Sequence, residues 1–248
     1  MNATPVDRPG ALENALENAL ENALETAPES GQERERAHVH VVVTAGPTRE
    51  HLDDVRFLTN ASTGRMGHEL AREAARRGAR VTLILGPSHL APLEGVDTVD
   101  VVSTEDLLRE ARKAAQDADL VLFAAAPCDW RPARRRRGKP PREGGDLEVK
   151  LRATPDVARS LRPRKGDRIH VGFALEVGGG EHRARMKLAD KGFDAIVLNG
   201  IENLGDGGGE IFWIPREGAL DELVCASKAK TAREIVKRAW ALLNGRAQ

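Results

Sequence analysis

Tyrosine is absent from this chain, and aromatic residues of every kind make up only 3% of it. A chain so poor in aromatic residues must build its core from Val, Leu, Ile and Ala. Those residues are typical of a parallel sheet that alanine-rich helices bury on both faces. The missing tyrosine also argues against an oxidoreductase that uses a tyrosine as its catalytic residue.

Three further absences limit the cellular setting. Cysteine occurs only as Cys128 and Cys225, which is too few for a disulfide framework and favours a reducing compartment. The sequence has no apolar run of membrane-spanning length and no signal-peptide pattern at its N-terminus. Lys+Arg and Asp+Glu both number 38, so the formal net charge is zero. We therefore expect a cytoplasmic protein whose partners are neither a membrane nor nucleic acid.

The common signatures of nucleotide and metal chemistry are missing too. Ala45-Gly-Pro-Thr48 follows the first predicted strand, where a dinucleotide site would carry Gly-x-Gly-x-x-Gly, and there is no Walker sequence. The seven histidines show no metal-binding spacing, so a structural or surface role is favoured for them. Cys128 follows a predicted strand without the spacing of a catalytic triad, and a small buried thiol is the better interpretation.

Strand and helix patterns alternate from position 38 onward. Apolar runs predict strands at 38–46, 80–85, 119–126, 147–151, 169–175 and 194–199, with late antiparallel strands at 210–214 and 223–226. Amphipathic runs predict helices at 66–77, 104–118, 181–191 and 228–243, and another that starts at 154–156 with proline in its first turn. This alternation predicts an α/β fold, a Rossmann-like three-layer sandwich with a mostly parallel central sheet, whose ligands bind beyond the strand C-termini.

Residues 1–37 differ in composition from this domain, which we place at 38–248. Ala-Leu-Glu-Asn repeats with a period of four, which builds no lasting apolar stripe on a helix and stacks glutamates four residues apart. We expect a tail that is disordered or a frayed helix, although a helix that binds a partner stays open.

The stretch 60–67 reads Asn-Ala-Ser-Thr-Gly-Arg-Met-Gly and leads into the helix predicted at 66–77. Ser62 and Thr63 are favoured N-cap residues, and Gly64 lets a backbone approach a ligand closely. The helix would direct unpaired N–H groups and the positive end of its dipole at this turn, which suits a phosphate. An ordinary capping turn explains the same residues equally well.

Residues 131–145 form a basic segment that is also rich in proline and glycine. A solvated charge run or a loose nucleic-acid patch is one interpretation. A mobile basic flap that closes over a polyphosphate is the other, and it accounts for the glycines as well as the charge.

Seven motifs follow one another along the chain and together resemble phosphopantothenate–cysteine ligase over residues 38–245. They are Thr44-Ala-Gly-Pro-Thr-Arg-Glu50, Val55-Arg-Phe-Leu-Thr-Asn-Ala-Ser-Thr-Gly-Arg-Met-Gly67, Ala124-Ala-Ala-Pro-Cys-Asp-Trp130, Thr154-Pro-Asp156, Val171-Gly-Phe-Ala-Leu-Glu176, Lys187-x-x-x-Lys191 and Asp194-x-Ile-Val-x-Asn199.

The resemblance implies a step of coenzyme A biosynthesis. Bacterial members of that family use CTP and Mg²⁺ to convert the carboxylate of 4′-phosphopantothenate into an acyl-cytidylate, which L-cysteine then attacks to give 4′-phosphopantothenoylcysteine and CMP. ATP in place of CTP stays open. The resemblance also implies a homodimer. Residues 1–37 are too short for the flavin-dependent decarboxylase domain that many relatives carry, so we expect a stand-alone ligase with a separate decarboxylase downstream.

The resemblance assigns roles to individual residues. Asn60 should hold the acyl-cytidylate, Asp129 should bind the ribose hydroxyls, and Arg56 should approach the phosphopantothenate across the dimer. The remaining nucleotide-binding positions implied are Gly46, Ser62, Thr63, Gly64, Ala124, Ala125, Thr154, Pro155, Asp156, Val157, Phe173, Lys187 and Lys191.

The basic segment departs from the family pattern Lys-x-Lys-Lys, whose first lysine assists formation of the acyl-cytidylate. The nearest match here is Arg136-Arg-Gly-Lys139. Either Arg136 or Lys139 could act, and we favour Lys139 because arginine is no neutral replacement for lysine. Two other functions stay open: an NAD(P)-dependent oxidoreductase, suggested by 63–67, and a non-catalytic nucleotide-binding protein.

Overall fold

The computed structural model describes residues 39–139, 141, 146–176, 180–200, 211–223 and 227–246. The tail predicted at 1–37 lies outside these residues, and its state stays a prediction. No helix in the described ranges is both long enough and apolar enough to cross a membrane.

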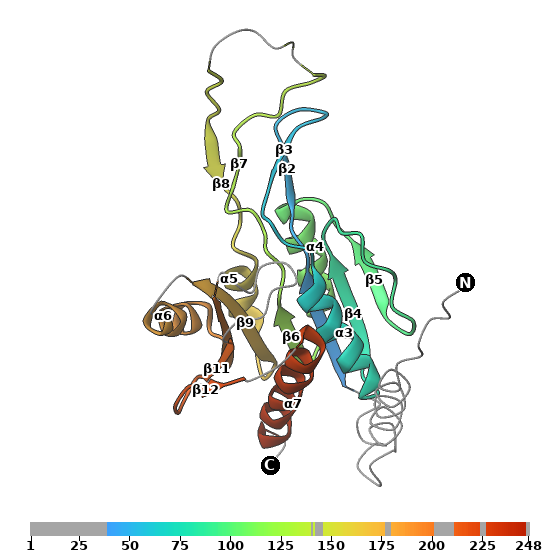
Figure 1. The fold of residues 1–248 in the computed structure, drawn as a ribbon, viewed down its shortest axis with the longest axis vertical. Coiled ribbons are helices and arrows are strands. Elements are labelled where there is room, and N and C mark those ends of the chain that lie inside the picture. Colours follow the sequence, from blue (N-terminus) through green and yellow to red (C-terminus); the bar gives the residue numbers. More distant parts are fainter. Residues whose placement is uncertain are drawn as a thin grey trace, which may run out of the picture. The chain divides into compact units, whose positions relative to one another are not determined.

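An eight-stranded sheet in the order β12-β11-β10-β9-β6-β1-β4-β5 forms the centre of the fold (Figure 1). Six neighbouring strands run parallel: β10 (Ala195–Gly200), β9 (Ile169–Glu176), β6 (Leu120–Phe123), β1 (His40–Ala45), β4 (Arg80–Leu85) and β5 (Asp97–Asp100). The antiparallel strands β11 (Ile211–Pro215) and β12 (Asp221–Glu222) complete one edge. The predicted fold class is confirmed.

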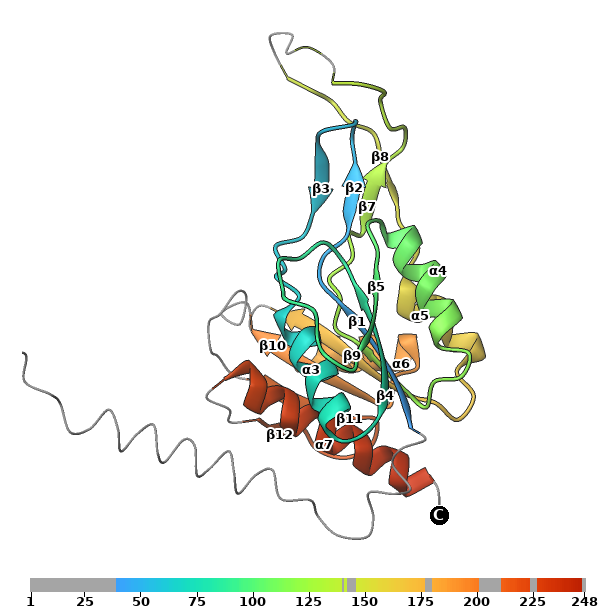
Figure 2. The ribbon, with the colours of Figure 1, turned by 90° about the vertical axis from the view of Figure 1, so that its right-hand side faces the viewer.

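Helices cover both faces of the sheet (Figure 2). One face carries α3 (Arg65–Arg76) and α7 (Lys228–Arg246), and the other carries α4 (Thr104–Ala114), α5 (Val157–Leu161) and α6 (Glu181–Lys191). Alternation along β1 explains the arrangement: Val41 and Val43 belong to the core under α3 and α7, whereas Val42 belongs to the core under α4. A strand buried on both faces is apolar at every position, which is the pattern that the sequence shows.

Two antiparallel hairpins project beyond the C-terminal ends of β1 and β6, and we call them together the arm. One joins β2 (Arg49–His51) to β3 (Phe57–Thr59), and the other pairs β7 (Trp130–Pro132) with β8 (Leu151–Ala153). The basic segment after β7 is tied to the β2–β3 turn, because the Gly138 amide donates to Asp54 Oδ2 at 2.7 Å. Arg135 pairs with the other oxygen of Asp54 at 2.9 Å.

Several predicted boundaries are wrong. The strand expected at 147–151 lies at Leu151–Ala153, since its partner β7 fixes the register. The helix after position 154 begins at Val157 behind an Asp156 cap, so Pro155 precedes the helix. The helix predicted to reach 118 ends at Ala114. The second late strand lies at Asp221–Glu222, and 224–226 are outside the described residues.

Candidate functional site

A cavity of about 600 Å³ opens beyond the C-terminal ends of the central strands, where the sheet topology places a ligand. Its wall comes from the turn before α3, the β6–β7 connection, the start of α5, the end of β9 and one side of α6. The sequence-predicted residues on that wall are Asn60, Ser62, Thr63, Gly64, Ala124, Ala125, Asp129, Thr154, Pro155, Asp156, Val157, Phe173, Lys187 and Lys191.

The turn before α3 is built differently from the prediction. The N-cap of α3 is Gly64, whose φ of 79° is left-handed, and no side chain caps the helix there. Ser62 Oγ instead accepts the Gly64 amide at 3.3 Å, and Thr63 Oγ1 accepts the Arg65 amide at 3.4 Å. The predicted serine or threonine cap is therefore wrong. This helix start on a cavity wall still suits an anion, because the first turn of a helix leaves amides without intrahelical partners and lies at the positive end of the helix dipole.

Gly64 packs directly on Gly46. A Cβ at Gly64 would lie 3.2 Å from Gly46 Cα, so the two glycines allow the turn to rest on the end of β1. Gly46 is itself buried and supports the turn from below, and it is not one of the residues that line the cavity.

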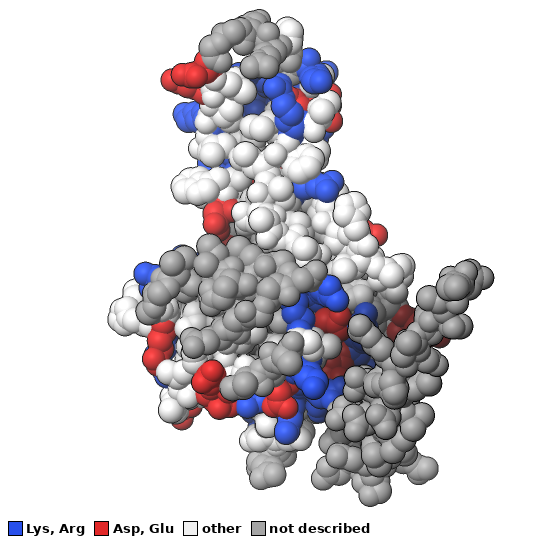
Figure 3. Space-filling model, in the orientation of Figure 1, with Lys and Arg blue, Asp and Glu red and all other residues white. Residues whose placement is uncertain are grey.

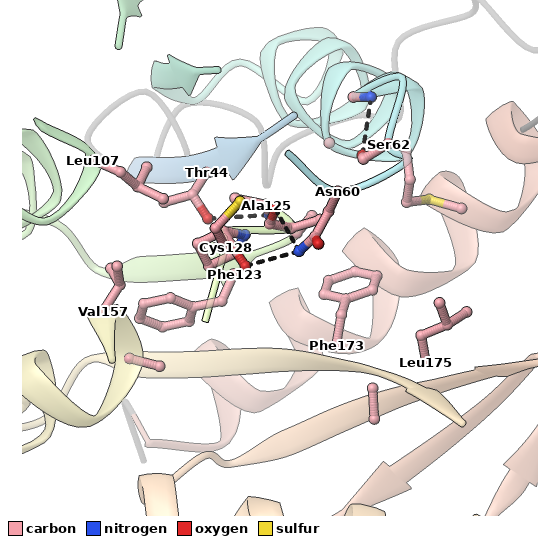
Figure 4. A pocket seen from close by; sticks show the side chains of 18 of the residues that line it. Thr44, Asn60, Ser62, Leu107, Phe123, Ala125, Cys128, Val157, Phe173 and Leu175 are labelled. Carbon is pink, nitrogen blue, oxygen red and sulfur yellow. Dashed lines mark hydrogen bonds between the residues drawn. The ribbon is translucent and has the colours of Figure 1, made fainter. Parts of the chain in front are cut away.

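Asn60 joins this turn to the β6–β7 connection. Its side-chain amide donates to the carbonyl oxygens of Pro127 at 2.9 Å and Ala126 at 3.3 Å. Figure 4 shows Asn60 and Phe173 directed toward the same space from different elements. The Asn60 amide is thereby held at the mouth of the cavity, next to where a bound ligand would lie.

Two lysines bring positive charge to the α6 side. Lys187 Nζ donates to the Phe173 carbonyl oxygen at 2.7 Å, and Lys191 Nζ lies 3.1 Å from Asp156 Oδ2. Burial alone would raise the pKa of the Asp156 carboxyl, but the Arg159 amide and the Lys191 charge outweigh it and lower that pKa. Asp156 is therefore ionised and holds Lys191 on the cavity wall.

Three threonines fix the β6–β7 connection, and sequence reasoning missed two of them. Thr48 Oγ1 accepts the Cys128 amide at 2.9 Å and lies 2.9 Å from Thr104 Oγ1. Thr154 Oγ1 donates to the Cys128 carbonyl oxygen at 2.5 Å. Thr48 directly follows the Ala45-Gly-Pro turn, and that position at a strand end is the signal that could have identified it.

Cys128 itself is buried, as predicted. Burial raises the pKa of its thiol, and the nearby carboxylates of Glu50 and Asp129 act in the same direction. The protonated thiol is a poor nucleophile, so the geometry assigns Cys128 a packing role.

The chain matches the model of the DFP family, described as the DNA/pantothenate metabolism flavoprotein C-terminal domain, over residues 36–242. The chain belongs to this family. It is 41% identical over 211 residues to the coenzyme A biosynthesis bifunctional protein CoaBC of Bacillus subtilis (strain 168), covering 82% of this chain and 51% of that protein. It is also 36% identical to a cysteine/cysteine sulfinic acid decarboxylase from an unknown prokaryotic organism, covering 82% of this chain and 58% of that protein. This DFP chain thus spans about half the length of the curated relatives it matches.

Solved structures share the fold of this DFP chain. The C-terminal domain of coenzyme A biosynthesis bifunctional protein CoaBC superposes with a TM-score of 0.74 at 33% identity, covering 85% of this chain and 99% of that one. The H337A mutant of Cab2 in complex with phosphopantothenate-cysteine superposes with a TM-score of 0.68, covering 98% of this chain and 97% of that one. At 16% identity the second likeness shows the fold alone.

Three predicted residues of this DFP chain lie on the arm and do not line the cavity. Arg56 pairs with Asp53 at 2.6 Å in the β2–β3 turn. Arg136 and Lys139 are exposed on the segment after β7. Figure 3 shows a group of Lys and Arg side chains at the upper end of that view. Lys228, at the start of α7, does line the cavity and was missed, because a lysine that opens a helix carries no distinguishing pattern.

Proposed function

We propose that this chain is a ligase that joins 4′-phosphopantothenate to L-cysteine through an acyl-cytidylate, in coenzyme A biosynthesis. The single observation that carries the proposal is the 600 Å³ cavity, in which the uncapped start of α3, Asn60 and the lysines of α6 converge. The DFP family membership and the naming of the relatives for coenzyme A biosynthesis support it.

The reaction balances in two steps. A carboxylate oxygen of phosphopantothenate attacks the α-phosphorus of CTP, a P–O bond forms, and the α–β phosphoanhydride breaks to release pyrophosphate. The cysteine amine then attacks the acyl carbon, a C–N bond forms, the acyl C–O bond breaks, and CMP and a proton leave. Neither step requires a protein nucleophile, and alignment with charge stabilisation suffices. That requirement agrees with a cavity whose cysteine is held protonated.

Residues on the wall divide the work in this proposal. The Ser62 and Thr63 hydroxyl groups, the start of α3 and the Lys187 and Lys191 ammonium groups bind phosphate oxygens, and Asp129 accepts hydrogen bonds from the ribose. Asn60 holds the acyl-cytidylate for attack. Arg56 approaches the phosphopantothenate from the partner subunit of a homodimer, and Lys139 or Arg136 reaches the site only when the basic segment moves.

Magnesium fits this site as an ion that arrives with the triphosphate. The described residues contain no group of three or more His, Cys, Asp or Glu side chains that could hold a metal by themselves. Mg²⁺ commonly takes one or two carboxylates plus substrate phosphates and keeps several waters, and Asp129 and Asp156 are carboxylates on the wall. When bound, the ion neutralises phosphate charge as pyrophosphate leaves.

The test is incubation of the chain with 4′-phosphopantothenate, L-cysteine and Mg²⁺ together with each nucleoside triphosphate in turn. We expect CTP to yield CMP, pyrophosphate and phosphopantothenoylcysteine in equal amounts, and the ATP reaction decides the nucleotide preference. Binding of NADPH without binding of CTP, or no pyrophosphate with any triphosphate, would overturn the proposal.

A further inference from the structure

A second cavity, of about 370 Å³, lies at the N-terminal end of β9, on the side of the sheet that α4 and α5 cover. The side chains that matter on its wall are those of Arg112, Ser160, Arg164, Arg168 and His170. None of them lines the nucleotide cavity. Phe123 separates the two spaces: it lines the first cavity, and its ring centroid lies 5.2 Å from that of His170.

The floor of this cavity carries two buried polar groups without partners. His170 is 1% exposed, and neither of its ring nitrogens has a hydrogen-bond partner among the described residues. The Nε–H of Arg168 is likewise unpaired there. The other nitrogens of Arg168 are used, since they donate to the carbonyl oxygens of Arg164 at 3.0 Å and of Gln116. Buried polar groups are nearly always hydrogen-bonded, so two orphans facing one space indicate a missing polar occupant.

The mouth of the cavity is positively charged. Arg112 and Arg164 are exposed, and within the described part of the chain neither guanidinium takes part in an ion pair or hydrogen bond. The C-terminal ends of α4 and α5 each bring roughly −0.5 of an elementary charge, which is less than three guanidinium groups supply. The Asp194 carboxylate, which accepts the His170 backbone amide at 2.7 Å, is already engaged by Lys165 at 2.9 Å and by Arg246.

We propose that this cavity is a second anion site, which takes a phosphate group between Arg112 and Arg164 at the mouth and the His170 and Arg168 N–H groups at the floor. Burial and the Lys165 charge lower the pKa of His170 to about 4, so at neutral pH its ring is uncharged and offers one donor. Arginine suits this role because its planar fork matches phosphate oxygens. The site is independent of the ligase proposal.

The test uses the His170 ring as a local reporter. Its imidazole signals are followed by NMR while inorganic phosphate, pyrophosphate and a phosphate monoester are titrated separately. We expect a saturable shift with at least one of them, and the tightest binder identifies the source of the phosphate group. Arg112→Ala with Arg164→Ala should weaken this binding at least tenfold. Lys230→Ala with Lys237→Ala removes the same charge from α7, on the other face of the sheet, and should leave the affinity unchanged.

A structural measurement completes the test. In crystals soaked with the tightest of the three, a phosphate oxygen should lie within hydrogen-bond distance of His170 or Arg168. Three outcomes would overturn the proposal: ring signals that do not move, a shift whose midpoint is the same in the double arginine variant, or a soak in which water alone occupies the cavity.

Discussion

At the scale of single residues, Asn60 makes the contact on which the catalytic proposal depends most directly. Its amide is donor to two carbonyl oxygens of the β6–β7 connection, and it is exposed to the cavity. A carboxylate of the same size would place negative charge against those carbonyl oxygens and against an incoming phosphate.

Asn60→Asp should therefore lower the rate of product formation by about 100-fold, which corresponds to the loss of a few kcal/mol of transition-state stabilisation. Because the second step is the one assigned to Asn60, the acyl-cytidylate should accumulate and be detectable by mass spectrometry after acid quenching. Unfolding temperature serves as the control and should change little, since the side chain is exposed. Normal turnover in this variant would remove Asn60 from the mechanism.

Asp53 is a second residue whose effect can be measured alone. The amides of Arg56 and Val55 donate to its carboxylate and, with the Arg56 guanidinium, lower its pKa from 3.8 to about 2. The unfolded chain therefore takes up its proton first as the pH falls, so the contribution of this carboxylate is complete above about pH 4 and is lost toward pH 2.

We expect Asp53→Asn to unfold at a lower temperature than the parent at pH 7. Between pH 4 and pH 2 the unfolding temperature of the variant should fall less steeply than that of the parent. Thermal unfolding across that range measures both. Glu217→Gln, at an exposed position, provides the comparison and should keep the slope of the parent protein. Parallel curves for Asp53→Asn and the parent would show that these hydrogen bonds do not stabilise the fold.

At the scale of elements, the distance between α3 and β1 determines where the turn at 62–64 lies, to which we assign phosphate binding. A Cβ on Gly67 would lie 2.4 Å from Ala45 Cβ, which is closer than carbon atoms can approach. The helix can therefore pack this tightly only with glycine at that position.

Gly67→Ala should destabilise the protein by about 1–3 kcal/mol, because overpacking outweighs the gain of roughly 1 kcal/mol that alanine brings to a helix. It should also weaken nucleotide binding, since α3 must move away from β1. Gly245→Ala is the matched control: that glycine lies in α7 with no atom within 4 Å of an added Cβ, so the substitution should stabilise. Urea unfolding measures the stability of both variants. Equal changes in the free energy of unfolding would contradict the close contact between α3 and β1 at Gly67.

The elements also differ in how far the sequence determines them. The helix predicted at 181–191 is observed at Glu181–Lys191, and the strand predicted at 80–85 at Arg80–Leu85, because local periodicity and a terminal glycine suffice there. Of the four strands of the arm only one was predicted, near β8, since strands of three residues such as β2 and β7 exist only through their partners. Gly64 caps α3 through a left-handed backbone conformation. The sequence did not predict this cap, because the neighbouring Ser62 and Thr63 are the more usual capping residues.

The residues of the candidate site also differ in how well the sequence predicts their positions. Apart from Gly46, the predicted residues at strand ends and on α6 lie on the cavity wall, because the topology brings them together, and their roles in binding a nucleotide stay predictions. Arg136 and Lys139 lie on the arm and not on the cavity wall. The sequence could not show this, because no sequence pattern predicts whether a basic loop is open or closed. Thr48 and Thr104 were missed because each makes its hydrogen bonds to residues distant in the sequence.

At the scale of the whole molecule, exposed apolar side chains concentrate on the arm. Among the described residues, six of the ten large hydrophobic side chains that are exposed belong to it: Val55, Phe57, Trp130, Leu147, Val149 and Leu151. Scattered exposed hydrophobic residues need no explanation, but a concentration on one projecting element indicates a surface that another protein covers. We propose that a second copy of the chain covers it, which would also bring one subunit's Arg56 toward its partner's cavity.

Sedimentation velocity should then report a dimer for the parent chain, and Leu147→Asp with Leu151→Asp should shift it to a monomer. Carboxylates at those positions would lose their water on association without gaining a partner, which costs several kcal/mol for each buried charge. Met186→Asp is the control: this side chain is 61% exposed on α6, away from the arm, and its change should leave the dimer intact. The monomeric variant should lose ligase activity, because Arg56 would no longer reach the cavity of a partner subunit. Its unfolding should stay as cooperative as that of the parent. A monomeric parent, or a monomeric variant with full activity, would show that one subunit suffices.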